Sequence, residues 1–222
     1  MTADVLERHA ISAADNPRLP WEVKKQILGL RSSDWGPIMI SYAKDKWGVV
    51  TTNLPTVEQL GSSWEENLNS YCEQVQACTG ALELVEKFAS IGFPMAIATS
   101  SRHSAVEKKR KNHGAMFQHL PTIVCGDHPA VKQGKPAPDI YIEAARQLGI
   151  NPKHCLVFED ALTGVRSAKA ACCHVVAVPD PRFDADEKAA FAAEADVVLE
   201  DLWHFSGKQF GIDIDMRSFK PI

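Results

Sequence analysis

The sequence of 222 residues lacks any apolar run approaching the roughly 20 residues that are needed to cross a bilayer. Its first residues, Met1 to His9, also lack the apolar stretch of a secretory signal peptide. Long internal repeats and low-complexity tracts are absent too. Together these absences predict a cytoplasmic protein with no membrane partner.

An excess of charge of either sign is also missing. The 24 Lys and Arg residues nearly balance the 28 Asp and Glu residues, which leaves a net charge of −4. With charges so nearly balanced, the chain lacks the excess of positive charge that is typical of nucleic-acid binding proteins, so no nucleic-acid partner is expected. The basic cluster from Arg102 to Lys111 is more typical of a solvated helix face than of a nucleic-acid site. Nothing in the sequence requires more than a monomer.

Spacings typical of zinc sites are not found either. The six cysteines contain no C-x-x-C repeat, and the eight histidines show no H-x-x-x-H spacing. Adjacent Cys172 and Cys173 could bind a soft metal or respond to oxidation, but small buried thiols are the commoner explanation.

The chain up to about residue 75 has helical patterns and no strand pattern. Helices are expected at 21–28, at 55–60 and at 63–72, where Ser63 and Glu66 have the spacing of a capping box. The five tryptophans, four of them in the first 64 residues, are expected mainly to pack these helices.

From Thr79 onward, strands alternate with helices. Strands are expected at 95–98, 122–125, 155–158, 175–178 and 197–199, and helices at 82–91, 103–113, 139–148 and 164–171. This alternation predicts an α/β fold with a doubly wound parallel sheet.

Polar residues follow two of the expected strands. The run Cys155-Leu-Val-Phe-Glu-Asp160 ends on two carboxylates, and Pro94-Met-Ala-Ile-Ala-Thr-Ser-Ser101 ends on three hydroxyls. Between them, the proline-stiffened loop Gly134-Lys-Pro-Ala-Pro-Asp139 holds one lysine with little freedom. Because open α/β folds bind ligands at the carboxyl edge of the sheet, this combination predicts a phosphate site with a hard cation such as Mg²⁺.

Each of these residues also has a structural interpretation. Glu159 and Asp160 could cap the next helix, although that explains one acid better than two. Lys135 alone would be a solvated lysine, and Thr99 to Ser101 could cap the helix near His103. Asp127 and Asp139 are expected to hold the Lys135 loop in place.

The three segments, together with Gly126 to Tyr141, resemble the haloacid dehalogenase-like hydrolase superfamily, most closely its phosphatases with a helical cap, of the pseudouridine-5′-phosphatase and β-phosphoglucomutase kind. The resemblance implies a cap over residues 1–75, a Rossmann-like core over 79–215 and a C-terminal tail over 216–222.

The resemblance also implies roles for individual residues. Thr99 and the backbone N–H of Ser100 would hold the transferring phosphoryl group, and Lys135 would neutralise its charge. Glu159 and Asp160 would bind Mg²⁺. In the cap, Arg31 falls where relatives carry a substrate-reading loop.

Family members begin with an apolar strand ending Asp-x-Asp-Gly, which supplies the nucleophile and the general acid/base. No such strand occurs in this sequence, and neither Asp4 nor Asp15 follows an apolar strand. The core is therefore expected to lack its first, central strand. Asp-x-Asp does occur at 184–186 and 213–215. The second is interpreted as a chance match on an exposed C-terminal segment, and the alternative is that this segment replaces the lost strand.

The sequence thus predicts a lineage of Mg²⁺-dependent phosphatases that hydrolyse a small phosphorylated metabolite through an aspartyl-phosphate. The chain as written is expected to be inactive. The alternative is a non-catalytic isoform or pseudoenzyme that binds a phosphorylated ligand or a partner protein.

Overall fold

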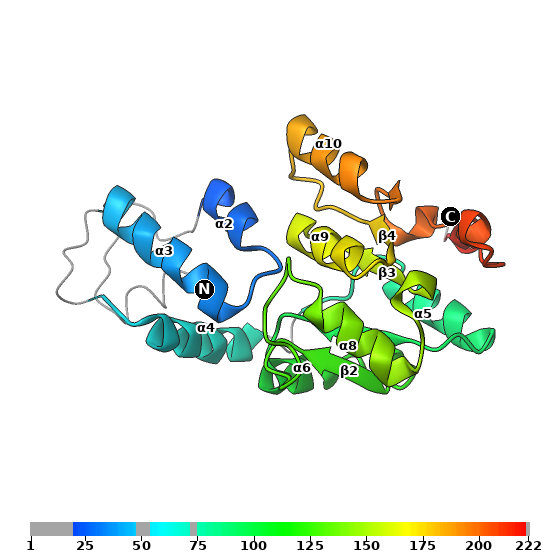
Figure 1. Cartoon of the computed structure of the whole chain (residues 1–222), viewed down its shortest axis with the longest axis horizontal. Helices are drawn as coiled ribbons and strands as arrows, with labels where there is room; N and C mark the ends of the chain where they lie inside the picture. The colour runs from blue at the N-terminus through cyan, green and yellow to red at the C-terminus, as the bar shows by residue number, and fades with distance from the viewer. Residues whose placement is uncertain (1–19, 48–53, 72–74, 221–222) are drawn as a thin grey trace.

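The structure is a computed structural model that describes residues 20–47, 54–71 and 75–220 (Figure 1). The expectations for Asp4, Asp15 and the segment Met1 to His9 lie outside the described residues, as does Cys72.

The first described helices form the unit that the sequence predicted as a cap. They are α2 (Trp21–Ile27), α3 (Ser32–Trp47) and α4 (Val57–Tyr71). Their buried residues make a small core of their own, which consists of Val23, Ile27, Trp35, Met39, Ala43 and Leu60. Figure 1 shows the three helices on one side of the α/β part of the molecule. The boundary near residues 75–79 stays a prediction.

Helix α4 corrects the prediction of two helices at 55–60 and 63–72. The helix begins earlier than the Ser63–Glu66 spacing suggested, because Thr56 and Gln59 make the reciprocal capping bonds at 2.9 and 3.1 Å. It continues through Gly61, where an added Cβ would lie 3.1 Å from the Cβ of Ser32. This glycine therefore serves the close packing of two helices and does not end one.

The α/β part contains strands and helices in alternation. They are α5 (Ala81–Ser90), β1 (Ala96–Thr99), α6 (His103–Arg110), α7 (Gly114–Phe117), β2 (Thr122–Cys125), α8 (Asp139–Leu148), β3 (Leu156–Glu159), α9 (Leu162–Ala170), β4 (His174–Ala177), α10 (Ala185–Glu194) and β5 (Val197–Val198). Short 3₁₀ turns follow at Leu202–His204, Gly207–Phe210 and Met216–Phe219. The predicted strands and helices are confirmed with small shifts of their ends.

Helix α10 was not predicted from the sequence. Its only buried residue is Phe191, so it shows little amphipathic pattern. Asp184, in the first Asp-x-Asp match, begins this helix through a capping box with Glu187.

The strands form two parallel sheets in the described part of the chain. β1 pairs with β2, and β4 lies between β3 and β5. No backbone pairing joins β1 to β3 among these residues, which fits a doubly wound core without its central strand.

Helices cover both faces of the sheets. Helices α8 and α9 contact each other; α8 packs on β1 and β2, and α9 on β3 and β4. Their shared core cluster includes Val124, Val157 and Val175 from three strands. On the opposite face, Leu84 and Phe88 of α5 belong to the cluster of Val176. This arrangement confirms the doubly wound class.

The C-terminal segment is not exposed in the way that was expected. Ile212, Ile214 and Met216 are buried on the cluster that contains Leu84 and Phe88. Asp215 caps the last 3₁₀ turn and pairs with Arg217. The second Asp-x-Asp match is therefore a packed structural turn. Of the helices that the structure describes, none has the length and apolar character that a membrane span needs.

Candidate functional site

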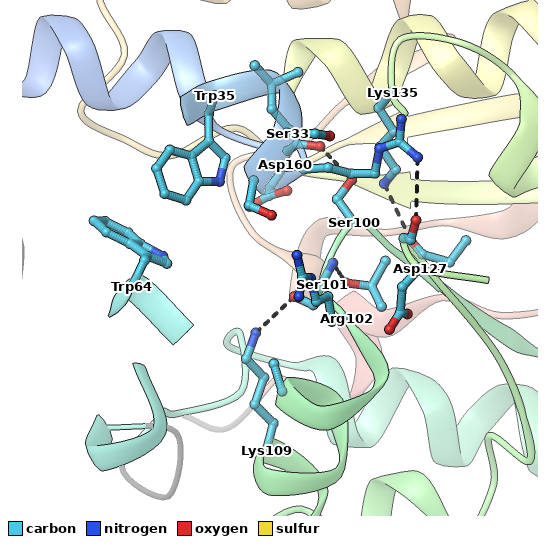
Figure 2. A pocket seen from close by; sticks show the side chains of 18 of the residues that line it. Ser33, Trp35, Trp64, Ser100, Ser101, Arg102, Lys109, Asp127, Lys135 and Asp160 are labelled. Atoms are coloured by element: carbon cyan, nitrogen blue, oxygen red, sulfur yellow. Dashed lines mark hydrogen bonds between the residues drawn. The ribbon is translucent and has the colours of Figure 1, made fainter. Parts of the chain in front are cut away.

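A cavity of about 930 Å³ lies between the cap and the carboxyl ends of β1 and β3. The cap contributes the loop Gly29 to Ser33 together with Trp35 and Trp64. The strand ends contribute Thr99 to Ser101 and Phe158 to Asp160, and Lys135 completes the wall. Figure 2 shows Ser100, Lys135 and Asp160 gathered at one end of this cavity. The structure therefore brings together all six residues that the sequence singled out, Arg31 included.

The hydroxyls after β1 are already partly engaged. The backbone N–H of Ser101 donates to Thr99 Oγ1 at 3.2 Å, and Ser100 Oγ donates to the carbonyl of Gly29 at 2.6 Å. Lys109 Nζ, from α6, donates to Ser101 Oγ at 3.5 Å. The hydroxyl hydrogen of Thr99 is not used by these bonds, so it can donate to an anion.

Helix α6 starts directly after this turn, but the N–H of its first residue, His103, is already occupied. Asp127 Oδ1 accepts from the backbone N–H of His103 at 3.1 Å. Asp139 Oδ2 accepts from the N–H groups of Lys132 and Gln133, both at 2.9 Å. Asp139 thus fixes the Lys135 loop as predicted, whereas Asp127 caps α6.

Lys135 is buried, with 7 % of its surface exposed. Its Nζ forms an ion pair with Glu159 and donates to Tyr141 Oη at 3.1 Å and to the carbonyl of Ala98 at 3.4 Å. A buried ammonium is costly unless it is paired, and these three acceptors meet that need. The ordinary interpretation of Lys135 as a solvated lysine is therefore wrong.

The two acids after β3 differ in their surroundings. Glu159 is buried, and its Oε1 accepts from both Lys135 and Tyr141. Burial, followed by the charge of Glu159, raises the pKa of Tyr141, so its hydroxyl stays protonated and acts as a donor.

Asp160 is open to the cavity, although protein surrounds it. Loss of water around the carboxyl, followed by the charge of Glu159, raises its pKa above the ordinary value. A carboxylate in this position gains from a nearby cation. Asp160 is therefore the more accessible of the two acids, while Glu159 pairs with Lys135; metal binding by the two acids stays a prediction.

Arg31 lines the cavity, but its guanidinium group is mostly used within the protein. Its Nε donates to Asp34 Oδ2 at 3.3 Å. Its other nitrogens reach the carbonyls of Gly126, Val131 and Lys132 at 3.4–3.5 Å. These bonds fasten the cap loop to the core, and a role in reading the substrate stays a prediction.

Sequence reasoning missed Tyr141 and Lys109. Tyr141 is the third residue of α8, and its partner Glu159 is distant in sequence. Lys109 was assigned to a solvated helix face.

The tryptophan prediction is confirmed for Trp35 and Trp64, which pack against each other in the cap with ring centroids 5.2 Å apart. Both also line the cavity. Trp21 instead packs against Phe183 of the core cluster.

The chain is similar in sequence to known proteins. A family model described as haloacid dehalogenase-like hydrolase matches residues 19–178. A probable pseudouridine-5'-phosphatase of Drosophila melanogaster is 34% identical over 203 residues, which cover 87% of this chain and 80% of the relative. The (DL)-glycerol-3-phosphatase 2 of Arabidopsis thaliana is 30% identical over 205 residues, covering 91% and 81% of the two chains.

Solved structures share the fold. CbbY from Rhodobacter sphaeroides in complex with phosphate superposes with a TM-score of 0.67 at 21% identity, covering 90% of this chain and 88% of that one. A β-phosphoglucomutase from Clostridium difficile gives a TM-score of 0.70 at 15% identity, covering 95% and 89%. At these identities the likeness concerns the fold.

Proposed function

Because the chain belongs to the haloacid dehalogenase-like hydrolase family, we propose that its cavity binds the phosphoryl group of a small phosphorylated metabolite and that its lineage hydrolyses it. The observation that carries the proposal is the meeting of Thr99, Lys135 and Asp160 at one end of a single cavity. Relatives named as phosphatases of a nucleotide and of glycerol phosphate support this substrate class. The site needs no second copy of the chain and no nucleic acid, and the chain acts in the cytosol.

Different residues supply the hydrogen bonds and the positive charge that bind a phosphoryl group. Thr99 Oγ1 and the backbone N–H of Ser100 donate to its oxygens, and Lys135 places a fixed positive charge beside them. For phosphoryl transfer, a protein mainly has to align the reacting groups and compensate the charge on the phosphoryl oxygens. Fixed hydrogen-bond donors in a partly enclosed site do both.

Magnesium fits this site through Asp160. Mg²⁺ is commonly held by one or two carboxylates, with substrate phosphate and water as its other ligands. The open carboxylate of Asp160 suits that role, and Glu159 adds negative charge behind it. The described residues contain no group of three candidate ligands, so the remaining ligands come from elsewhere. When bound, the ion neutralises charge on the phosphoryl oxygens.

Turnover needs a carboxylate nucleophile, which the family supplies from a strand ending Asp-x-Asp-Gly. Asp184 and Asp215 cap helical turns, while Asp186 and Asp213 are exposed and do not line the cavity, so neither Asp-x-Asp match provides this group. The chain as written therefore binds phosphate without turning over. The alternative is that the chain is a non-catalytic protein, which would bind a phosphorylated ligand or a partner protein in the same cavity.

An activity assay and a binding assay together test the proposal. With p-nitrophenyl phosphate and a panel of sugar and nucleoside phosphates in Mg²⁺, we expect turnover below about 0.1 per second, against an enzyme median of roughly 10 per second. Calorimetric titration with inorganic phosphate in Mg²⁺ should show binding. Lys135→Ala and Thr99→Val should each weaken it by about tenfold, since each removes a donor to an anion.

Lys132→Ala is the matched control, because Lys132 lies in the same loop with an exposed side chain. It should leave the phosphate affinity unchanged. Equal affinity for phosphate in the parent chain, Lys135→Ala and Thr99→Val would place the anion site elsewhere. Turnover well above the stated limit would show that the nucleophile had been overlooked.

A further inference from the structure

The cavity between the cap and the core, termed the phosphate cavity below, has two walls of different chemistry. The core wall is polar and charged, because it consists of the strand ends and of Lys135. The cap wall carries the apolar side chains Leu30, Trp35, Val57 and Trp64. Among the described cap residues of this wall, Arg31 is the only cation, and Asp34 and three backbone carbonyls already engage it. The cap wall is therefore suited to an apolar group of a substrate and not to a second anion.

Trp64 gives the cap wall an aromatic surface that the cap's own core does not cover. Trp35 is buried, with 7 % of its surface exposed, whereas Trp64 is half-buried and packs against the cap core from outside. The two rings are tilted by 56° with centroids 5.2 Å apart, so neither ring covers a whole face of the other. Figure 2 shows both rings on one side of the cavity and Ser100 and Lys135 on the other. The remaining surface of Trp64 is therefore available to a ligand whose phosphoryl group lies at Lys135.

Packing of α3 against α4 fixes the position of this aromatic surface. Val57, Gly61 and Trp64 recur at the spacing i, i+4 and i+7, so they share one face of α4. An added Cβ on Gly36 would lie 2.7 Å from Val57 Cγ1, and Gly61 packs closely on α3 as well. The two glycines thus allow the close approach that brings the two tryptophans into contact. A ring that is held in place before binding loses little conformational freedom when a ligand packs on it.

The size of the cavity also favours a substrate larger than a short polyol phosphate. Its volume of about 930 Å³ is near the upper end of the roughly 300–1,000 Å³ that is usual for small-molecule sites. A glycerol phosphate would leave most of this space to water, and it has no apolar surface to place on Trp64. A flat aromatic ring would remove apolar surface of the indole from water and stack on it. Such a ring therefore matches both the volume and the cap wall.

We propose that the substrate of this cavity is a phosphate monoester with a flat aromatic ring, of the nucleoside 5′-monophosphate class, and that Trp64 selects it. The core wall holds the phosphoryl group at Thr99 and Lys135, while the ring packs against Trp64 on the cap wall. Trp35 supports the Trp64 ring from the core of the cap. The inference rests on the proposed function, since it names the substrate class for the same phosphoryl site.

The test compares uridine 5′-monophosphate with ribose 5-phosphate, which has the same phosphorylated sugar and lacks the base. In calorimetric titrations of the full chain with Mg²⁺ present, the nucleotide should bind about tenfold more tightly. Stacking of a base on an aromatic side chain usually strengthens binding by a factor between about five and 150. Trp64→Ala should bring the ratio of the two affinities close to one, mainly by weakening the binding of the nucleotide. Trp64→Phe should keep most of the ratio, because phenylalanine retains a ring.

Two controls separate stacking from a general loosening of the cap. Tyr42 packs against the same cap core but does not line the cavity, so Tyr42→Ala should leave the ratio of the two affinities unchanged. Trp64→Leu keeps an apolar side chain without a ring. In proton NMR spectra, the base protons of the bound nucleotide should move upfield with the parent chain, through the ring current of the indole. With Trp64→Leu they should move much less.

Several outcomes would overturn the proposal. Equal affinities of the parent chain for the two ligands would do so, as would a ratio that persists in Trp64→Ala. A sugar bisphosphate that binds more tightly than the nucleotide would show that the cap end of the cavity takes an anion and not a ring. If the parent chain binds uridine but neither inorganic phosphate nor ribose 5-phosphate, the ring site stands and the proposed function alone is contradicted.

Discussion

At the scale of single residues, the position of Lys135 depends on the space beside Glu159. The Glu159 carboxylate lies against the first turn of α9, where an added Cβ on Gly164 would lie 2.1 Å from Glu159 Cδ. No side chain fits there without moving the carboxylate. Because Glu159 holds both Lys135 and Tyr141, Gly164 indirectly sets the position of the cation in the phosphate cavity.

Gly164→Ala should therefore destabilise the protein by about 2 kcal/mol, the usual cost of overpacking, even though alanine is the better helix former. Urea unfolding measures this change. Gly114→Ala is the matched control, since an added Cβ meets nothing within 4 Å there, and its effect should stay within about 0.5 kcal/mol. Equal stability of the two variants would mean that Glu159 is free to move.

At the scale of elements, the loop between α2 and α3 fastens the cap to the core. Ser100 Oγ donates to the carbonyl of Gly29, and Thr163 Oγ1 donates to that of Leu28 at 3.0 Å. Arg31 adds its bonds to the loop that holds Gly126 and Val131. The left-handed conformation of Gly29, with φ of 75°, allows the chain to turn between these attachments. The loop thus closes one side of the cavity.

Arg31→Ala should loosen this attachment and cost about 1 kcal/mol, because its hydrogen bonds are long and partly solvated. Amide hydrogen exchange in residues 126–134 should accelerate in the variant without any ligand present. Arg110→Ala, at an exposed arginine of α6, should leave that exchange unchanged. If Arg31→Ala changes only the preference among phosphorylated substrates, its role is substrate reading and not attachment.

At the scale of the whole molecule, the core consists of two parallel sheets with an apolar cavity of about 570 Å³ between β1 and β3. In the described residues, the three-stranded sheet and the two-stranded sheet share their layers of helices. No backbone hydrogen-bond ladder joins one sheet to the other. Short separate sheets have fewer cooperative contacts than one continuous sheet, and open strand edges invite pairing with other chains.

Thermal unfolding followed by circular dichroism should therefore be broad or partly irreversible, with a midpoint below about 60 °C, the upper part of the mesophile range. A sharp, reversible transition above that temperature would show that the two sheets already form one cooperative unit.

The sequence by itself determined the class of the fold and most of its elements. Short continuous apolar runs and the helical patterns between them are local, so β1 to β4 and α8 could be placed from the chain alone. The chemistry at the strand ends followed as well, because parallel strands bring Thr99 and Asp160 to the same edge whatever the details of packing. Local signals misled at Gly61, where close packing of α3 and α4 outweighs helix propensity, and they missed α10, which shows little amphipathic pattern.

Only the tertiary structure decided which groups are free to act. Glu159 and Asp160 are neighbours in sequence, yet one is buried against Lys135 and Tyr141 while the other faces the cavity. Arg31 proved to be engaged with backbone carbonyls from a distant loop. The apolar cavity between β1 and β3 depends on two strands about 60 residues apart and on the helices that cover both of their faces. Such contacts arise from long-range packing, which no local pattern in the chain encodes.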